Sequence, residues 1–160
     1  MATKPEQSRS GRDALGQFEH THGHLNALVL GVATSLRAVD SDAPTAWEEV
    51  AARLGILRDE LLRHFADEEE ALFPFVRTSV PAMTGAVERL EAAHDAICGG
   101  VVRAHAAARA HQRALVAVLH ERFERSYVEH SRAEAELFEA LGGVLDERQR
   151  SELSRLLRGL

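Results

Sequence analysis

Apolar residues recur along this chain at alternating steps of four and three, and this spacing restricts the fold more than any other feature. Residues spaced in this way lie along one side of an α-helix and form a face that becomes buried. Glycine and proline are nearly confined to a few places, β-branched residues are sparse, and strands are not indicated anywhere. The pattern therefore predicts an all-α fold with four long helices. The four faces read Phe18, His22, Leu25, Val29, Val32, Leu36 and Val39; Val50, Leu54, Leu57, Leu61, His64, Glu68, Ala71 and Phe75; Val87, Leu90, His94, Ile97, Val101 and Ala104; and Val116, Leu119, Phe123, Tyr127, His130, Glu134, Leu137 and Leu141.

Turn-forming residues between the faces give the expected helix boundaries. The first helix covers about 13–40 and ends at Ser-Asp-Ala-Pro, whose proline can open the next helix. The second helix ends near Thr78, before Pro81, and the fourth ends at Gly142-Gly143. We therefore expect an up-down-up-down four-helix bundle.

The remaining segments complete the expected domain organisation. Residues 1–12 are predicted to be a disordered tail, and residues 13–145 to be the bundle. Residues 146–160 carry leucines on one side and form a short C-terminal fifth helix, packed on the bundle or at a subunit contact. A chain of 160 residues that is 45% hydrophobic fits a single domain.

Each of the four faces contains one histidine, and these histidines fall at one level. In an up-down-up-down bundle, residues at one level on successive helices are equally far from the turn that joins them. The residues halfway between consecutive histidines are Ala43, Ser79 and Gln112, and all three fall in predicted turns, although neither Gly nor Pro marks the last. The sequence thus predicts one core layer that contains His22, His64, His94 and His130.

Two HxxxE motifs add carboxylates to this layer. His64 and Glu68, like His130 and Glu134, are four residues apart and lie on the same side of their helix. A buried carboxylate costs several kcal/mol unless a cation or strong donors compensate it. The two halves of the chain repeat one plan, so we expect a pseudo-twofold site with a lone histidine and an HxxxE motif for each of two metal ions. Such donors suit Fe, Mn or Zn, and bridging carboxylates favour a pair of irons.

Several neighbouring residues have open alternatives. His20 or His24 replaces His22 as the ligand if the helix register differs. Tyr127 either reaches a bridging oxygen, gates the pocket or binds iron, or it fills the core with its hydroxyl at the bundle edge. Cys98 is expected to be inert packing rather than a redox-active thiol. Glu69 is a candidate acceptor for a histidine N–H, or part of a solvated acidic face. His105, His111 and His120 are expected at the surface.

Composition limits the classes of partner and the compartment. Twenty-five acidic against 19 basic residues give a formal charge of -6, and no basic patch indicates nucleic acid binding. Cys98 is the single cysteine, so no intramolecular disulfide can form and a reducing compartment suits the chain. No run of 18 apolar residues indicates a membrane span. We expect a soluble, cytoplasmic protein, and the sequence leaves its oligomeric state open.

Across about residues 15–145 the histidine and HxxxE pattern, with Glu-Glu-Ala-Leu-Phe-Pro after Glu68, resembles the hemerythrin-like, or HHE cation-binding, family. The resemblance implies a four-helix bundle with two iron ions joined by an oxo or hydroxo bridge, which meets O2, nitric oxide or peroxide. Cys98 stands where oxygen carriers have another histidine, and HxxxE replaces their HxxxxD. The pattern is closer to bacterial hemerythrin-like proteins and the di-iron domain of iron-cluster repair proteins.

The resemblance leaves two function classes open. One is a di-iron protein that reacts with a small oxidant or diatomic ligand, including a peroxide- or nitric-oxide-directed oxidoreductase. The other is a non-catalytic O2 or NO sensor, or an iron-storage or iron-donating protein. Both need the same ligands, so the sequence does not separate them. A metal-free helical interaction protein is a third reading, and it leaves the two core glutamates without compensation.

Overall fold

The computed structural model describes residues 10–39 and 44–157, and every regular element in these ranges is helical. The all-α prediction is thus confirmed. The elements are α1 (Ser10–Ala38), α2 (Pro44–Asp67), the π-helical turn η2 (Glu68–Leu72), α3 (Phe73–Ser79), the 3₁₀ turn η3 (Pro81–Met83), α4 (Thr84–Arg109), α5 (Arg113–Val144) and α6 (Glu147–Leu157).

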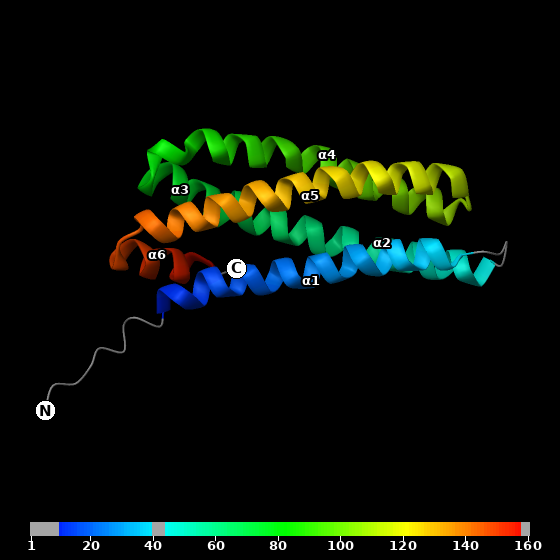
Figure 1. Ribbon diagram of the computed structural model, residues 1–160, viewed down its shortest axis with the longest axis horizontal. Coiled ribbons are helices and arrows are strands. Elements are labelled where there is room, and N and C mark those ends of the chain that lie inside the picture. The colour runs from blue at the N-terminus through cyan, green and yellow to red at the C-terminus, as the bar shows by residue number, and fades with distance from the viewer. Residues whose placement is uncertain (1–9, 40–43, 158–160) are drawn as a thin grey trace, which may run out of the picture.

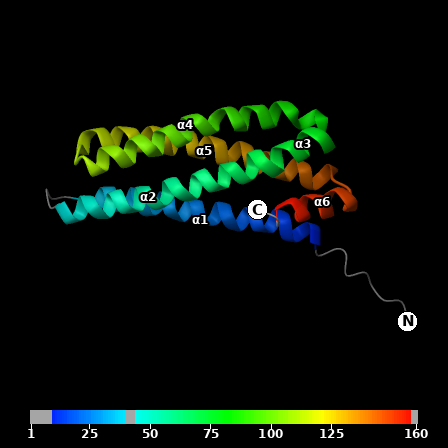
Figure 2. The same cartoon turned by 180° about the vertical axis from the view of Figure 1, so that it is seen from behind.

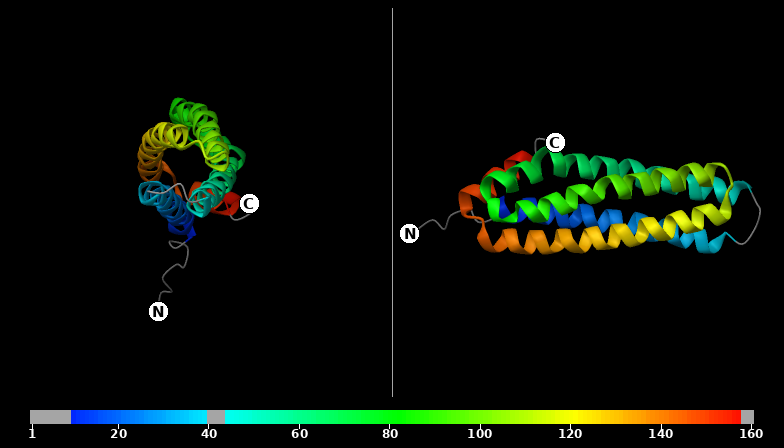
Figure 3. Two further views of the ribbon diagram at one scale, coloured as in Figure 1. Left: turned by 90° about the vertical axis from the view of Figure 1, so that its right-hand side faces the viewer. Right: turned by 90° about the horizontal axis from the view of Figure 1, so that it is seen from above.

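The long helices form a bundle. α1, α2, α4 and α5 lie side by side along the long axis of the molecule, and α6 lies beside α1 at one end (Figures 1 and 2). Seen end-on, the long helices surround a common interior (Figure 3). α4 packs most extensively against α5, and α2 packs against both α1 and α4. No helix in the described ranges is both long and apolar enough to cross a lipid bilayer.

The interior has two apolar clusters with a polar layer between them. One cluster includes Leu61 and Ile97, and the other includes Leu72 and Leu90. Along α4, His94 stands between Leu90 and Ile97, so the histidine level separates the two clusters. Apolar packing on both sides holds the polar layer in the middle of the bundle.

The second long helix departs from the single continuous helix predicted up to Thr78. At η2, the Phe73 N–H donates to the Glu68 carbonyl, five residues earlier. This π-helical turn adds one residue to the usual α-helical repeat. Pro74 follows directly and has no N–H to donate, so it cannot restore the α-helical hydrogen bond at that point. The extra residue rotates the later part of the helix, which buries Phe73 and Val76 as well as the predicted Phe75.

Helix ends differ from the sequence predictions at two places. α1 begins at Ser10, so residues 10–12 of the expected tail are helical. Residues 1–9 and 40–43 lie outside the described residues, and the second range includes all of the expected Ser-Asp-Ala-Pro turn except its proline, which begins α2. α5 continues through Gly142 and Gly143 to Val144. Its end is capped from α6, because Arg150 donates to the carbonyls of Gly142 at 2.6 Å and Leu145 at 2.9 Å. A side chain from another helix thus replaces the expected glycine stop.

α6 has its own start signal. The Gln149 N–H donates to Asp146 Oδ1 at 2.8 Å, and Gln149 Oε1 accepts from the Asp146 N–H at 3.0 Å, which is a reciprocal cap. Leu153 is buried, and α6 contacts α1 and η2. The fifth helix therefore covers the end of the bundle next to Glu68.

Candidate metal centre

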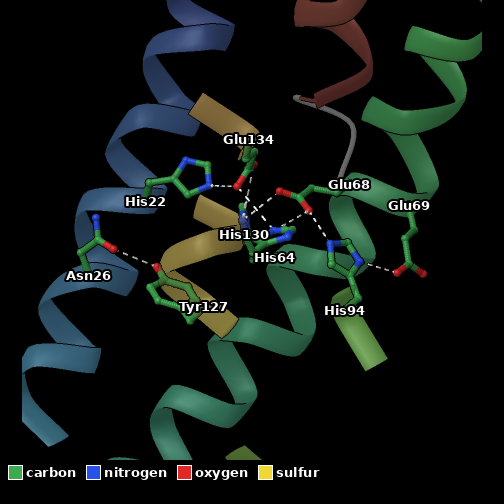
Figure 4. A network of polar contacts seen from close by, with 9 residues as sticks. All are labelled: His22, Asn26, His64, Glu68, Glu69, His94, Tyr127, His130 and Glu134. Carbon is green, nitrogen blue, oxygen red and sulfur yellow. Dashed lines mark hydrogen bonds and ion pairs between the residues drawn. The ribbon is translucent and has the colours of Figure 1, made fainter. Parts of the chain in front are cut away.

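The structure brings together all six residues that the sequence singled out as metal ligands. α1, α2, η2 and α4 each contribute one side chain, and α5 contributes two (Figure 4). Five of the side chains are at most 4% exposed, and His22 is 18% exposed. The six are His22, His64, Glu68, His94, His130 and Glu134.

The ligand atoms fall into two groups, and within each group all the atoms lie within 4.8 Å of one another. In the first group, His22 Nε2 lies 2.7 Å from Glu134 Oε2. His64 Nε2 lies 2.9 Å from Glu68 Oε1 and 3.9 Å from Glu134 Oε1. Two imidazoles and two carboxylates thus converge on one point.

The second group shares Glu68 with the first. His94 Nε2 lies 3.0 Å from Glu68 Oε2, and His130 Nε2 lies 4.0 Å from the same oxygen. Glu134 Oε2 is 3.6 Å from His130 Nε2, so this carboxylate also faces both groups. The lone His22 pairs with His64, and the lone His94 pairs with His130.

These donors fit a pair of cations. The carboxylate oxygens of Glu68 and Glu134, and the Nε2 atoms of His94 and His130, are buried and make no hydrogen bond of normal geometry within the described chain. If none of these atoms carried a proton, their lone pairs would face one another at these short separations, which is costly without a positive charge between them. Imidazole and carboxylate donors suit Fe, Mn or Zn.

In the metal-free protein the two glutamates have opposite pKa shifts. Burial, followed by the neighbouring Glu134, raises the pKa of Glu68 well above its usual value. Burial also acts to raise the pKa of Glu134, but Glu68 and the nearby His22 and His64 outweigh it and lower this pKa to about 2. Without metal, the pair therefore holds one proton and one negative charge.

Two of the histidines are held neutral. Burial lowers the pKa of His64, and it lowers the pKa of His130 to about 4. Burial alone would lower the pKa of His94 too, but Glu68 and Glu69 raise it above the usual value. Neutral imidazoles are the form that binds metal, so His64 and His130 are ready to bind without losing a proton.

We expect the metal-free protein to lose stability as the pH falls from about 6.5 to 4, partly because of His130. The pKa of His130 is about 4 in the folded protein and 6.5 in the unfolded chain. Its contribution to the free energy of unfolding is therefore complete above pH 6.5 and is lost as the pH falls to about 4. The expected loss from this residue is up to about 3 kcal/mol. Urea unfolding at several pH values measures it, and His130→Phe should flatten this part of the profile. An equal loss in wild type and variant would contradict the assignment.

Glu69 and two phenylalanines fix the orientation of His94. Glu69 Oε1 lies 2.6 Å from His94 Nδ1, so the acceptor suggested by the sequence is at hydrogen-bonding distance. Phe65 stacks on the His94 ring with centroids 3.9 Å apart, and Phe73 lies at 5.5 Å. With Nδ1 held by Glu69, Nε2 is directed at Glu68.

Tyr127 and Cys98 do not reach the cluster. The Tyr127 hydroxyl donates to Asn26 Oδ1 at 3.0 Å, and so ties α5 to α1 (Figure 4). Burial raises the pKa of Tyr127 to about 12, which keeps the phenol protonated. Cys98 packs half-buried against the apolar core, and burial raises the pKa of its thiol. These contacts favour the packing alternative for both side chains.

The structure tests most of the predictions for the remaining histidines. His24 is exposed, whereas His22 reaches Glu134, and the His20 side chain lies outside the described residues. His111 is exposed and His105 is half-buried, but His120 is 5% exposed, so the surface prediction for His120 is wrong. His120 packs 6.1 Å from the Phe123 ring, and burial lowers its pKa.

Sequence reasoning missed two features of the centre. The π-helical turn begins at Glu68 itself, and Pro74 after it was the only available signal. The Asn26 partner of Tyr127 is an exposed polar residue on another helix, and no local pattern distinguishes it.

Fold and site together define a helical bundle with a buried, His- and Glu-rich, cation-binding layer. Comparison with protein families gives the same answer, because residues 13–141 match the Hemerythrin HHE cation binding domain. The chain therefore belongs to the hemerythrin HHE family.

Curated relatives match over a shorter region. Three proteins named Iron-sulfur cluster repair protein YtfE, from Yersinia pseudotuberculosis serotypes O:1b, O:3 and I, are each 35% identical over 74 residues. The match covers 46% of this chain and 33% of each relative, so the chain matches about a third of their length. No solved structure gives a significant match.

Proposed function

We propose that this protein binds two iron ions at the buried layer and that the iron pair binds or reacts with a small oxidant or diatomic ligand. The ligands are His22 and His64 for one ion and His94 and His130 for the other, with Glu68 and Glu134 as bridges. An oxo or hydroxo bridge completes the pair. Membership of a cation-binding family supports the proposal, as does the donor set.

The placement of Glu68 carries this proposal. Its two oxygens face different histidines, with Oε1 at 2.9 Å from His64 and Oε2 at 3.0 Å from His94. A carboxylate that offers one oxygen to each of two imidazole-lined positions has the arrangement of a bridging ligand. A carboxylate that served a single metal ion would direct its oxygens toward one set of imidazoles only.

The residues of the chain have separate tasks in this proposal. Iron, when bound, supplies the redox chemistry and open coordination positions for a small ligand. The imidazoles and carboxylates set the number of anionic ligands, and Glu69 holds the His94 ring in orientation. Phe65 and Phe73 exclude water from the His94 side of the layer.

A role in repair of iron-sulfur clusters is a second candidate, since the curated relatives carry that name. Iron storage, or reversible sensing of O2 or NO, uses the same ligands without turnover. Initial rates of peroxide loss, compared with reversible spectral changes on adding O2 or NO, separate a reacting centre from a sensing one.

The proposal also includes the architecture of the chain and its location in the cell. We infer an up-down-up-down four-helix bundle over residues 13–145, with α6 as an added end piece. A cytoplasmic location fits the single cysteine, which allows no internal disulfide.

Metal analysis of protein purified from iron-replete cells tests the proposal. We expect two irons per chain and near-ultraviolet charge-transfer bands from oxo-bridged ferric iron. Zinc alone at one ion per chain would overturn the di-iron assignment.

A further inference from the structure

A pocket between α2 and α4 lies at the end of the bundle opposite α6 (Figure 1). Its volume is about 480 Å³, which is within the range of small-molecule sites. His105 lines it and follows His94 by eleven residues on α4, so the pocket is ~16 Å along the bundle from the proposed metal centre. The residues that line the pocket include none of the six proposed metal ligands.

Four basic side chains line this pocket. Arg58 belongs to α2, His105 and Arg109 belong to α4, and His111 lies in the turn after α4. Glu48 is the single carboxylate among the lining residues, although the whole chain has a formal charge of -6. The pocket therefore gathers basic groups on a chain that is acidic overall, and this favours an anionic ligand.

Arg58 fixes the His105 ring at the wall of the pocket. Arg58 Nη1 donates to His105 Nδ1 at 3.0 Å, and Nε of the same guanidinium donates to Asp59 Oδ1 at 2.8 Å. Burial, followed by the charges of Arg58 and Arg109, lowers the pKa of His105, so the ring is neutral near pH 7. Because Nδ1 accepts a hydrogen bond, the neutral ring carries its proton on Nε2.

Gly55 leaves space in front of this His105 N–H. A Cβ atom on Gly55 would lie 3.4 Å from His105 Nε2, and both residues line the pocket. Small side chains continue the floor beside Gly55, and these are Ala51, Ala52 and Ala108. The N–H of His105 therefore stands over an apolar floor.

Arg109 is not engaged in an ion pair. Arg53, Arg63 and Arg125 each lie within 3.1 Å of a glutamate three or four residues away on the same helix. Arg109 is exposed, and it pairs with no carboxylate in the part of the chain that the structure describes. Its planar guanidinium is thus available to bind an oxyanion through two N–H groups.

His111 stands at a position that favours glycine. Its φ of 55° lies in the left-handed region, and no other non-glycine residue in the described ranges has a positive φ. The His111 N–H donates to the Ala108 carbonyl at 3.0 Å, and the Gln112 N–H donates to the Ala107 carbonyl at 3.0 Å, which is a Schellman cap at the end of α4. Glycine makes this cap without conformational cost, so the cap itself does not require an imidazole.

We propose that the α2–α4 pocket binds a small organic anion, with its carboxylate or phosphate group on His105, Arg109 and His111 and its apolar part on the alanine floor. Arg58 orients His105 and adds positive charge. The pocket is larger than an inorganic oxyanion, and methyl groups line its floor, so the ligand carries an organic body. The inference does not depend on the metal centre or on the proposed function.

Binding of two matched pairs of anions tests the proposal. The pairs are phenyl phosphate with inorganic phosphate, and benzoate with acetate. In an NMR titration, the organic member of at least one pair should shift the His105 ring signals saturably and bind about tenfold more tightly than its smaller counterpart. The pair that does so identifies the anionic group. No saturable shift with any of the four would overturn the site, and equal affinity within both pairs would overturn the apolar floor as part of it.

Removal of one charge tests the anionic contact. Arg109→Gln should weaken the binding by about tenfold, because a charge-assisted hydrogen bond to the ligand is lost. Arg103→Gln is the matched control, since Arg103 is an exposed arginine of the same helix that does not line the pocket. Equal affinities in the two variants would overturn the assignment.

Two further variants separate binding from folding. His111→Gly should weaken the binding and leave the urea midpoint equal or higher, because glycine adopts the left-handed conformation freely. Gly55→Leu keeps every charge but fills the floor in front of His105, so it should abolish the binding while the protein stays folded. Unchanged affinity in the folded Gly55→Leu protein would show that the anion binds elsewhere.

Discussion

Replacing Glu68 by alanine is expected to abolish the two-iron stoichiometry while the helix content survives. Glu68 faces His64 with one oxygen and His94 with the other, so its loss removes a ligand from both halves at once. Glu134→Ala should act in the same direction, because Glu134 faces His22 and His130. Loss of a shared ligand weakens the binding of both ions, whereas loss of a terminal ligand weakens the binding of one.

The measurement is iron per chain after anaerobic loading and gel filtration, with far-ultraviolet circular dichroism on the same samples. Glu70→Ala is the matched control, since Glu70 lies in the same π-helical turn but is exposed. We expect one iron or fewer in the Glu68 variant and two in the control. Two irons in Glu68→Ala would show that Glu68 is not a bridge.

The level of the histidines was predictable because it depends only on helix period and turn position. Residues four apart share a helix side, and equal distances from a turn place residues at equal height. These rules use no information about packing. The structure accordingly brings His22, His64, His94 and His130 into one layer.

Features that depend on contacts between distant segments were not predictable. α5 passes through Gly142 and Gly143 because Arg150 of α6 caps its carbonyls, and the local sequence indicated a stop. Tyr127 turns to Asn26, which is 101 residues away in the chain. His120 is buried although it lies near a turn, where a polar residue is usually exposed.

The π-helical turn at the candidate metal centre was also not predictable from the sequence. A strict spacing of four and three carries the apolar face through Ala71 to Phe75 and leaves Phe73 outside it. The extra residue at η2 brings Phe73 inside, where it lies against His94. The energy that favours this irregular turn comes from burying a large aromatic side chain, and an average helix period cannot represent it.

The second large effect concerns the metal-free protein, in which the two glutamates should respond oppositely to neutralisation. The raised pKa of Glu68 means that its contribution to stability is greatest below about 4.5 and is lost as the pH rises. The lowered pKa of Glu134, about 2, means that its contribution is present above 4.5 and is lost as the pH falls. Glu134 stays ionised because Glu68 donates a hydrogen bond to it and because His22 lies 2.7 Å away.

Near neutral pH and without metal, Glu68→Gln should therefore stabilise the protein by about 1–3 kcal/mol, and Glu134→Gln should destabilise it by a similar amount. Urea unfolding of the chelator-treated proteins gives both values, and changes of the same sign would contradict the assignment of the proton to Glu68. With iron bound, both variants should be less stable than wild type, because each has lost a ligand and the linked binding energy with it. A sign change for Glu68→Gln between the two conditions would mean that this carboxylate is costly to bury in the empty bundle and is kept for the metal.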